Sequence, residues 1–387
     1  MQRYDAMYPK RTSLPVRTSA LMMFVQSAGA LNMDPVDWAC SSRAFACISG
    51  ELLNRSKETH MVTFSFAKYF GEINMLADLQ FMPGDKPYID RPSVAPEPKD
   101  LLVYLGCNVL RTAHLAKTVI GVLKAMGFDF NTAGGPAHCC GIIHYNHDDR
   151  KGAHTVAANS MRHFARYGAK KVLMWCPSCN EHYDEVVTKE QAVPFPYEHV
   201  TAFIARHLDR ITFARRIEKR VAMHYHTGYP QSDLDWENTR RILLAIPGVE
   251  LIDIENPAAL GRHCAPKWIG RIGRPQWQKA ISGVFDAARD ARVDILATLY
   301  HSCHREICQE EAHYPFEIVN YISLLGQAIG IEHPDVYKRY KLRGDPEAVY
   351  EELQPYIHAN GLDPFRVREV LRSAFAPACE PEESNPS

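Results

Sequence analysis

Five cysteines between residues 107 and 179 are the side chains whose type and spacing could do the most chemistry. One cysteine is followed after 31 residues by an adjacent pair and a glycine, and 35 residues after the pair comes a Cys-Pro-Ser-Cys turn. Thiolates are soft, anionic donors that suit iron–sulfur clusters and zinc. The spacing therefore favours metal binding within this group of cysteines, which consists of Cys107, Cys139, Cys140, Cys176 and Cys179.

Parts of this pattern have simpler explanations when taken alone. A Cys-x-x-Cys turn occurs in zinc sites and in thioredoxin-like redox pairs, and an adjacent cysteine pair can be buried as small apolar residues. Adjacent residues on a strand point to opposite faces, so Cys139 and Cys140 converge only on a turn, which Gly134, Gly135 and Gly141 permit. An iron–sulfur cluster, a zinc ion and no metal are three open interpretations.

Composition limits the class of protein. The 387 residues are 46% hydrophobic and 23% charged with a net charge of -1, so no bulk charge draws the chain to nucleic acid or anionic lipid. The apolar stretch 20–33 is shorter than the roughly 20 residues that cross a bilayer, so no membrane span is expected. Five of the eleven cysteines are grouped between residues 107 and 179, which in a large chain favours metal binding in a reducing compartment, and we expect a cytoplasmic protein.

Short apolar strands and amphipathic helices alternate after residue 100. Residues 101–105 and 171–175 read as strands, with helices expected over 110–126 and 155–167, which is typical of a parallel α/β sheet. The second strand runs directly into the Cys-x-x-Cys turn, and carboxyl ends of parallel strands are where binding loops gather. The elements therefore place the cysteines at one edge of a sheet.

The plan of this region recurs later in the chain. Residues 221–226 parallel 102–107, and residues 294–303 parallel 170–179, with offsets of about 120 residues. We expect two duplicated α/β domains. The predicted organisation is an N-terminal segment with helices over 37–53 and 62–79 that ends in a proline-rich linker (1–95), domain 1 (100–215), domain 2 (216–335), and a helical extension with a polar tail (336–387).

The second copy has lost three of the five thiol positions. His226 stands at the first position, the pair has become Cys264-Ala265, and Cys303 ends a Tyr-His-Ser-Cys turn. Three hypotheses are open: decay without metal, a substitute zinc or iron site around His226, Cys264 and Cys303, or a reactive thiol in a substrate pocket. Cys264 and Cys303 could also converge as a redox pair.

The complete first pattern resembles the cysteine-rich CCG domain. This domain occurs in the B subunit of heterodisulfide reductase, in the D subunit of the membrane-bound form, and in related lactate-utilisation and succinate dehydrogenase subunits, usually in two copies. The chain is similar to the B subunit of heterodisulfide reductase, with a degenerate second copy. The resemblance covers about residues 100–330 and implies a [4Fe–4S]-type cluster, cubane or non-cubane, held by the five cysteines.

The resemblance implies an iron–sulfur electron-transfer subunit of an oxidoreductase complex in sulfur metabolism. No Gly-x-Gly-x-x-Gly dinucleotide fingerprint is present, so a ferredoxin-like iron–sulfur subunit and a flavoprotein subunit are the expected partners. One alternative is a catalytic disulfide- or persulfide-handling subunit with substrate near Cys264, Cys303 and His226. The other is a structural zinc protein.

The remaining cysteines and several aromatic residues carry less weight. Cys40, Cys47 and Cys379 are expected to be bystanders. Residues beside the motif either tune a cluster through burial and hydrogen bonds or simply pack, and these are Trp175, His138, His144 and His147.

Overall fold

The computed structural model describes residues 64–86 and 96–376. The chain divides into two compact units, Met1–Phe64 and Ser65–Ser387, and the account below concerns the second. The helix expected over 37–53 and the cysteines at 40, 47 and 379 lie outside the described residues.

Two four-stranded parallel sheets form the framework, so the predicted α/β class is confirmed. The first sheet has the order β2-β1-β3-β4 and the second has the equivalent order β6-β5-β7-β8. The repeated order is the structural form of the duplication predicted from the sequence. The strands are β1 (Leu101–Tyr104), β2 (Phe130–Ala133), β3 (Lys171–Met174), β4 (Tyr197–His199), β5 (Lys219–His224), β6 (Val249–Ile252), β7 (Ile295–Thr298) and β8 (Glu317–Asn320).

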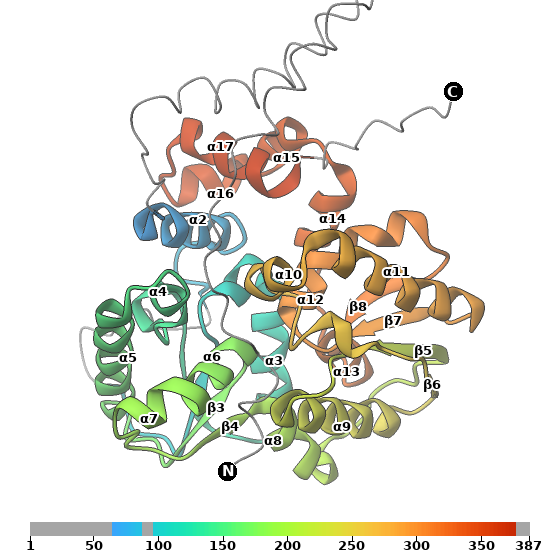
Figure 1. Cartoon of the computed structure of the whole chain (residues 1–387), viewed down its shortest axis with the longest axis horizontal. Helices are drawn as coiled ribbons and strands as arrows, with labels where there is room; N and C mark the ends of the chain where they lie inside the picture. The colour runs from blue at the N-terminus through green and yellow to red at the C-terminus, as the bar shows by residue number, and fades with distance from the viewer. Residues whose placement is uncertain (1–63, 87–95, 377–387) are drawn as a thin grey trace, which may run out of the picture. The chain divides into compact units, whose positions relative to one another are not determined.

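Each sheet is covered by helices on both faces, because its strands are apolar on both sides. In β1, Val103 packs toward the other sheet, whereas Leu102 and Tyr104 pack against the outer helix. Figure 1 shows α3, α8, α9 and α13 between the two sheets, with α5 and α11 on the outer sides. These helices are α3 (Ala113–Ala125), α5 (Arg150–Ala165), α8 (Val200–Arg206), α9 (Pro230–Ala245), α11 (Arg274–Asp290) and α13 (Tyr321–Ala328).

The middle layer is shared by both halves of the duplication. Helix α3 of the first half packs against α13 of the second, and α8 of the first packs against α9 of the second. One continuous apolar cluster contains side chains from all four helices and from both sheets. Each Å² of apolar surface removed from water favours folding by about 25 cal/mol. Packing of this shared layer therefore holds the two halves together.

A helical cap combines an early helix with the C-terminal region (Figure 1). Ser65 caps α2 (Phe66–Asp78), since its hydroxyl accepts a hydrogen bond from the Lys68 N–H. The Asn360 side-chain amide donates to the carbonyl oxygens of Asp78 and Phe81, which ties the cap together. The C-terminal helices are α14 (Val336–Arg343), α15 (Pro346–Glu352), α16 (Gln354–Ala359) and α17 (Pro364–Phe375).

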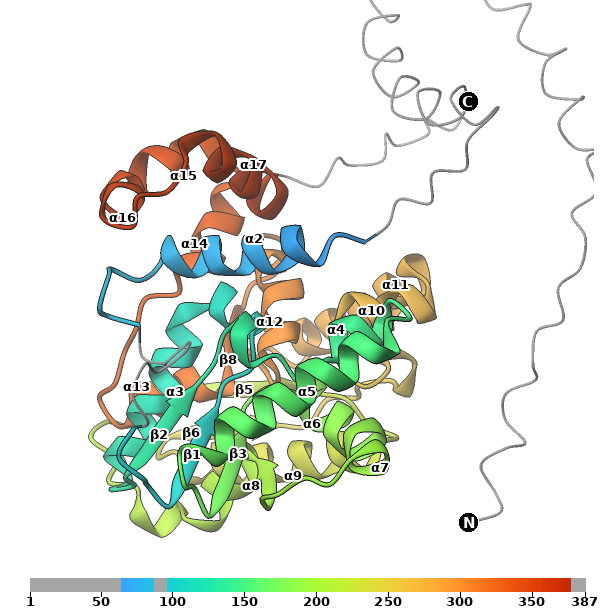
Figure 2. The ribbon, with the colours of Figure 1, turned by 90° about the vertical axis from the view of Figure 1, so that its left-hand side faces the viewer.

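Short helices complete the connections between the strands and the longer helices, and Figure 2 shows several of them from the side. Those of the first half are α4 (Ile142–Asn146), α6 (Pro177–His182) and α7 (Thr188–Glu190), with the short helices η2 (Asn108–Arg111), η3 (Pro136–His138), η4 (Tyr183–Val187) and η5 (Leu208–Arg210). Those of the second half are α10 (Pro266–Ile272), α12 (His301–Ile307), η6 (Ala258–Leu260) and η7 (Cys308–His313). Among the described residues, no helix is both long and apolar enough to cross a bilayer.

Backbone hydrogen bonds continue beyond the regular strands of the first sheet. Leu105 N–H donates to Ala133, Trp175 N–H donates to Tyr104, and Gly135 N–H donates to the carbonyl oxygen of Gly106. The three loops after β1, β2 and β3 are therefore held side by side at one edge of the sheet.

Candidate metal centre

All five predicted cysteines lie in the three loops at the carboxyl edge of the first sheet. Cys107 precedes η2, Cys139 and Cys140 follow η3, and Cys176 and Cys179 lie at the start of α6. Each side chain is buried, with an exposed fraction between 1% and 6%. Five thiols from three separate loops thus face a region largely closed to water.

The thiols form one unbroken series of contacts. Side-chain hydrogen bonds join Cys107 to Cys139 and Cys139 to Cys140. The series continues from Cys140 to Cys179 and ends at Cys176. A buried, convergent set of soft donors is the chemistry that an iron–sulfur cluster requires, so these residues fit such a group.

Two glycines allow this convergence. Gly106 has φ +74°, and a Cβ atom there would lie 2.8 Å from the Cβ atom of Cys176. Gly141 has φ +96°, its N–H donates to Cys139 Sγ over 3.4 Å, and a Cβ atom would lie 2.5 Å from the carbonyl oxygen of Ala153. Since side chains are disfavoured at positive φ and have no room here, both positions require glycine.

Replacing Gly141 tests this turn. We expect Gly141→Ala to lower the free energy of unfolding by about 2–3 kcal/mol, because it combines positive-φ strain with a backbone clash. The matched control is Gly127→Ala, where φ is +77° but no atom lies within 4 Å of the added Cβ, and we expect about 1 kcal/mol there. Denaturant unfolding measures both, and equal losses would contradict the steric argument.

The second domain contributes a residue to this centre. His301, in the first turn of α12, is buried and makes a side-chain hydrogen bond to the thiol of Cys176. Sequence reasoning did not select His301, although it occupies the position that corresponds to Pro177 within the duplicated turn. A donor at a ligand sulfur is a means by which a protein tunes a cluster.

A second polar group lies at the Cys107 end. Asn108 Nδ2 lies 3.9 Å from Cys107 Sγ and donates to the Tyr69 hydroxyl over 2.7 Å. The Asn108 Oδ1 atom accepts from Arg305 of α12 over 3.2 Å. Helix α2 and the second domain therefore both support this end of the thiol series, which the sequence did not reveal.

The thiols of the series differ in pKa. The hydrogen bond with Cys139 is the main cause that raises the pKa of Cys107, followed by burial, whereas Arg111 opposes this rise. Burial disfavours ionisation of Cys140, but hydrogen bonds with Cys139 and Cys179 lower its pKa to about 6. Metal binding requires thiolates, so the arrangement already favours ionisation of a central member.

The aromatic residues singled out beside the motif make other contacts. His138 Nδ1 lies 3.2 Å from the carbonyl oxygen of Gly134, and His144 pairs with Asp149 at 2.8 Å. Trp175 stacks on Tyr321 with ring centroids 6.2 Å apart, and His147 lies edge-on to the Phe66 ring at 6.1 Å. These contacts are consistent with packing, and a role in cluster tuning stays a prediction.

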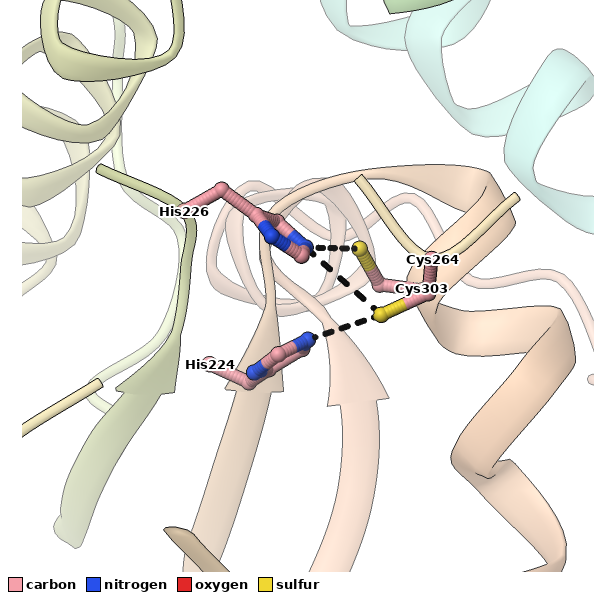
Figure 3. Close-up of side chains that lie close together, drawn as sticks. All are labelled: His224, His226, Cys264 and Cys303. Carbon is pink, nitrogen blue, oxygen red and sulfur yellow. Dashed lines mark hydrogen bonds between the residues drawn. The ribbon is translucent and has the colours of Figure 1, made fainter. Parts of the chain in front are cut away.

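In the second domain, the structure brings together His226, Cys264 and Cys303 and adds His224 (Figure 3). The ligand atoms of all four residues lie within 4.8 Å of one another, and every member is buried. The sequence signal for His224 is the His-x-His spacing, since residues two apart on an extended chain can face the same side. Both thiols are 0% exposed, which counts against direct attack on a substrate.

A cavity of about 160 Å³ lies between the two halves. Its lining includes Pro177 of α6, beside Cys176, and Tyr300, whose ring stacks on His226 at 6.2 Å. Arg262 and Glu181 also line it and lie 3.6 Å apart. The cavity therefore adjoins both groups of cysteines.

The five-cysteine series lies inside a segment that is similar to a known protein family. Residues 101–183 match the cysteine-rich domain family CCG. The CCG match contains the whole of the predicted ligand set, and it ends before β5, the first strand of the second sheet.

Curated relatives extend the similarity beyond the CCG segment. The chain is 26% identical over 259 residues to the D subunit of dihydromethanophenazine:CoB–CoM heterodisulfide reductase from Methanosarcina barkeri, and 28% identical over 261 residues to that of Methanosarcina mazei. Each match covers 62% of this chain and 62% of the relative, so the chain spans about three fifths of the relatives' length. These relatives are D subunits, and the finer prediction of a B-type subunit stays a prediction.

Likeness to solved structures is weaker. A hypothetical protein from Helicobacter pylori aligns with a TM-score of 0.46 and 13% identity, over 73% of this chain and 57% of that one. An aspartate racemase homologue from Pyrococcus horikoshii OT3 gives a TM-score of 0.28 and 10% identity, over 60% of this chain and 98% of that one. Neither likeness bears on function.

Proposed function

We propose that this chain is the iron–sulfur electron-transfer subunit of a heterodisulfide-reductase-like oxidoreductase, with one [4Fe–4S]-type cluster bound by the five domain 1 cysteines. The continuous series of buried thiols within the CCG segment carries the proposal. Such a cluster would supply one-electron transfer. The setting we propose is the reducing cytoplasm, because ligand thiols must stay reduced.

The residues of this chain would divide the work between holding the cluster and excluding water. The thiols hold it, Gly106 and Gly141 let the loops approach, and the donor from His301 balances negative charge at Cys176. Cys107 and Cys176 are the most exposed members, each 6% exposed. Electrons would therefore reach a partner most directly at these two ends of the thiol series.

The proposed partners follow from the proposed electron-transfer role. A cluster subunit needs an electron donor and an acceptor, and we propose a ferredoxin-like iron–sulfur subunit and a flavoprotein subunit for these roles.

Metal analysis of anaerobically purified protein tests the proposal. We expect about four iron and four acid-labile sulfide per chain, with broad visible absorption that bleaches on reduction. Zinc at the five-cysteine site without sulfide would overturn electron transfer and leave the structural zinc hypothesis.

The cavity beside Cys176 supports a second candidate, direct handling of a disulfide or persulfide. Its lining residue Pro177 directly follows the ligand Cys176, so a sulfur compound bound in the cavity would lie beside the cluster ligands. The substrate would then lie at the domain boundary, whereas the sequence predicted it near Cys264 and Cys303, which are fully buried. Disulfide reduction by the isolated chain with an artificial electron donor would favour this candidate, whereas a need for partner subunits would favour electron transfer.

A further inference from the structure

We propose that domain 2 holds a single structural zinc ion, bound in a closed tetrahedral site by His224, His226, Cys264 and Cys303 (Figure 3). The inference does not depend on the proposed function, because its four ligands are separate from the five cysteines of domain 1. It assigns a metal to the half of the duplication that has lost the cluster pattern.

The distances between donor atoms match a tetrahedral ion. His224 Nε2 lies 3.2 Å from Cys264 Sγ, and His226 Nε2 lies 3.2 Å from Cys303 Sγ and 3.6 Å from Cys264 Sγ. Zinc bonds of about 2.0–2.1 Å to nitrogen and 2.3 Å to sulfur place tetrahedral N and S ligands about 3.5 Å apart. The side chains therefore need little movement to accept the ion.

Both imidazoles are oriented as zinc ligands. His226 Nδ1 lies 2.8 Å from the carbonyl oxygen of Gly261, so Nδ1 carries the proton and Nε2 presents a lone pair to the sulfurs. His224 Nδ1 lies 3.1 Å from Asn256 Oδ1. The Asn256 amide is itself fixed, since its Nδ2 donates to the carbonyl oxygen of Met223 over 2.9 Å.

Separate elements converge on this site in the same way as at the five-cysteine centre. His224 ends β5 and His226 follows it, Cys264 precedes α10, and Cys303 lies in the first turn of α12. All four side chains are at most 1% exposed. With four protein ligands and no access for water, the site has the form of structural zinc sites, whereas catalytic zinc keeps an open position.

The arrangement discriminates against an iron–sulfur cluster with the same ligand types. Clusters with two histidines and two cysteines carry both histidines on one iron and both cysteines on the other. Here His226 Nε2 is within 3.6 Å of both sulfurs, so the histidine nitrogens and the cysteine sulfurs are not separated into two groups that could bind two different irons. A single ion fits this interleaved geometry.

Zinc content measured together with iron and sulfide tests the inference on the full chain. We expect about one zinc per chain in the unmodified protein, and its loss in Cys264→Ala with iron and sulfide unchanged. Cys308→Ala is the matched control, since Cys308 is also 0% exposed and lies five residues after Cys303 but belongs to the helical cap cluster. It should keep its zinc.

A second measurement covers the case in which Cys264→Ala does not fold. Protein produced with cobalt in place of zinc should show the intense visible bands of tetrahedral Co²⁺ and sulfur-to-cobalt charge transfer in the near ultraviolet. Unmodified protein without zinc, zinc that persists in Cys264→Ala, or a cobalt spectrum without tetrahedral bands would each overturn the inference. Failure of the iron–sulfur proposal would appear separately, as absent iron and sulfide beside an intact zinc signal.

Discussion

Cys140→Ala is expected to reduce the iron and acid-labile sulfide of the purified protein from about four each per chain to less than about one. Cys140 lies in the middle of the thiol series, in contact with Cys139 on one side and Cys179 on the other. Its removal interrupts the series between Cys139 and Cys179, so the two remaining pairs, Cys107 with Cys139 and Cys176 with Cys179, lose the donor that joins them. Visible absorption and colorimetric iron and sulfide assays measure the loss.

The control for this variant must also remove a buried thiol. Cys308→Ala does so outside the series, at the start of η7 where Cys308 packs against the helical cap, and should cost only about 1–2 kcal/mol of stability through the small cavity it creates. It should keep full iron and sulfide. Equal cluster loss in both variants would show that the effect arises from general destabilisation and would refute the ligand assignment.

His301→Ala is expected to lower the reduction potential of the cluster by about 50 mV while iron and sulfide stay constant. The hydrogen bond that His301 gives to the Cys176 sulfur stabilises the more negative, reduced state, so its removal makes reduction harder. A differential of about 1.4 kcal/mol between oxidation states corresponds to about 59 mV for one electron. Redox titration followed by electron paramagnetic resonance measures the shift.

A conservative variant separates the hydrogen bond from packing. His301→Gln keeps an N–H donor in a similar position and should restore most of the potential, whereas a purely steric role would leave both variants alike. An unchanged potential in His301→Ala would show that the contact with Cys176 does not tune the centre.

The α/β framework and the convergence of the first group of cysteines could be predicted from the sequence, because both depend on short-range sequence patterns. Strand 101–105 was predicted within one residue of β1, since an apolar run bounded by Gly106 is a short-range pattern. The glycines around Cys139 and Cys140 predicted a turn, and Gly135 and Gly141 indeed have positive φ. The prediction that these loops share one sheet edge followed from parallel topology alone.

What the sequence did not reveal depends on contacts between distant segments. His301 and Cys176 are 125 positions apart, and their contact depends on how the second half packs against the first. Tyr69 lies in a helix that the sequence predicted, but its contact with Asn108 depends on how that helix packs against the loop after β1. His224 shares a His-x-His spacing with His226, but its role depends on the position of Cys264 relative to the end of β5.

The helix contacts in the shared middle layer are related by an approximate twofold repeat of the two halves. Helix α9 is the counterpart of α3, and α13 is the counterpart of α8, so the pairs α3 with α13 and α8 with α9 repeat one contact with the halves exchanged. This is the self-complementary form of a twofold homodimer. A solitary half would expose its side of this layer to water and would need a second copy of itself. Fusion into one chain supplies that copy permanently and leaves its ligand positions free to diverge. Selection on packing alone is thus enough to retain a second half whose thiols have changed.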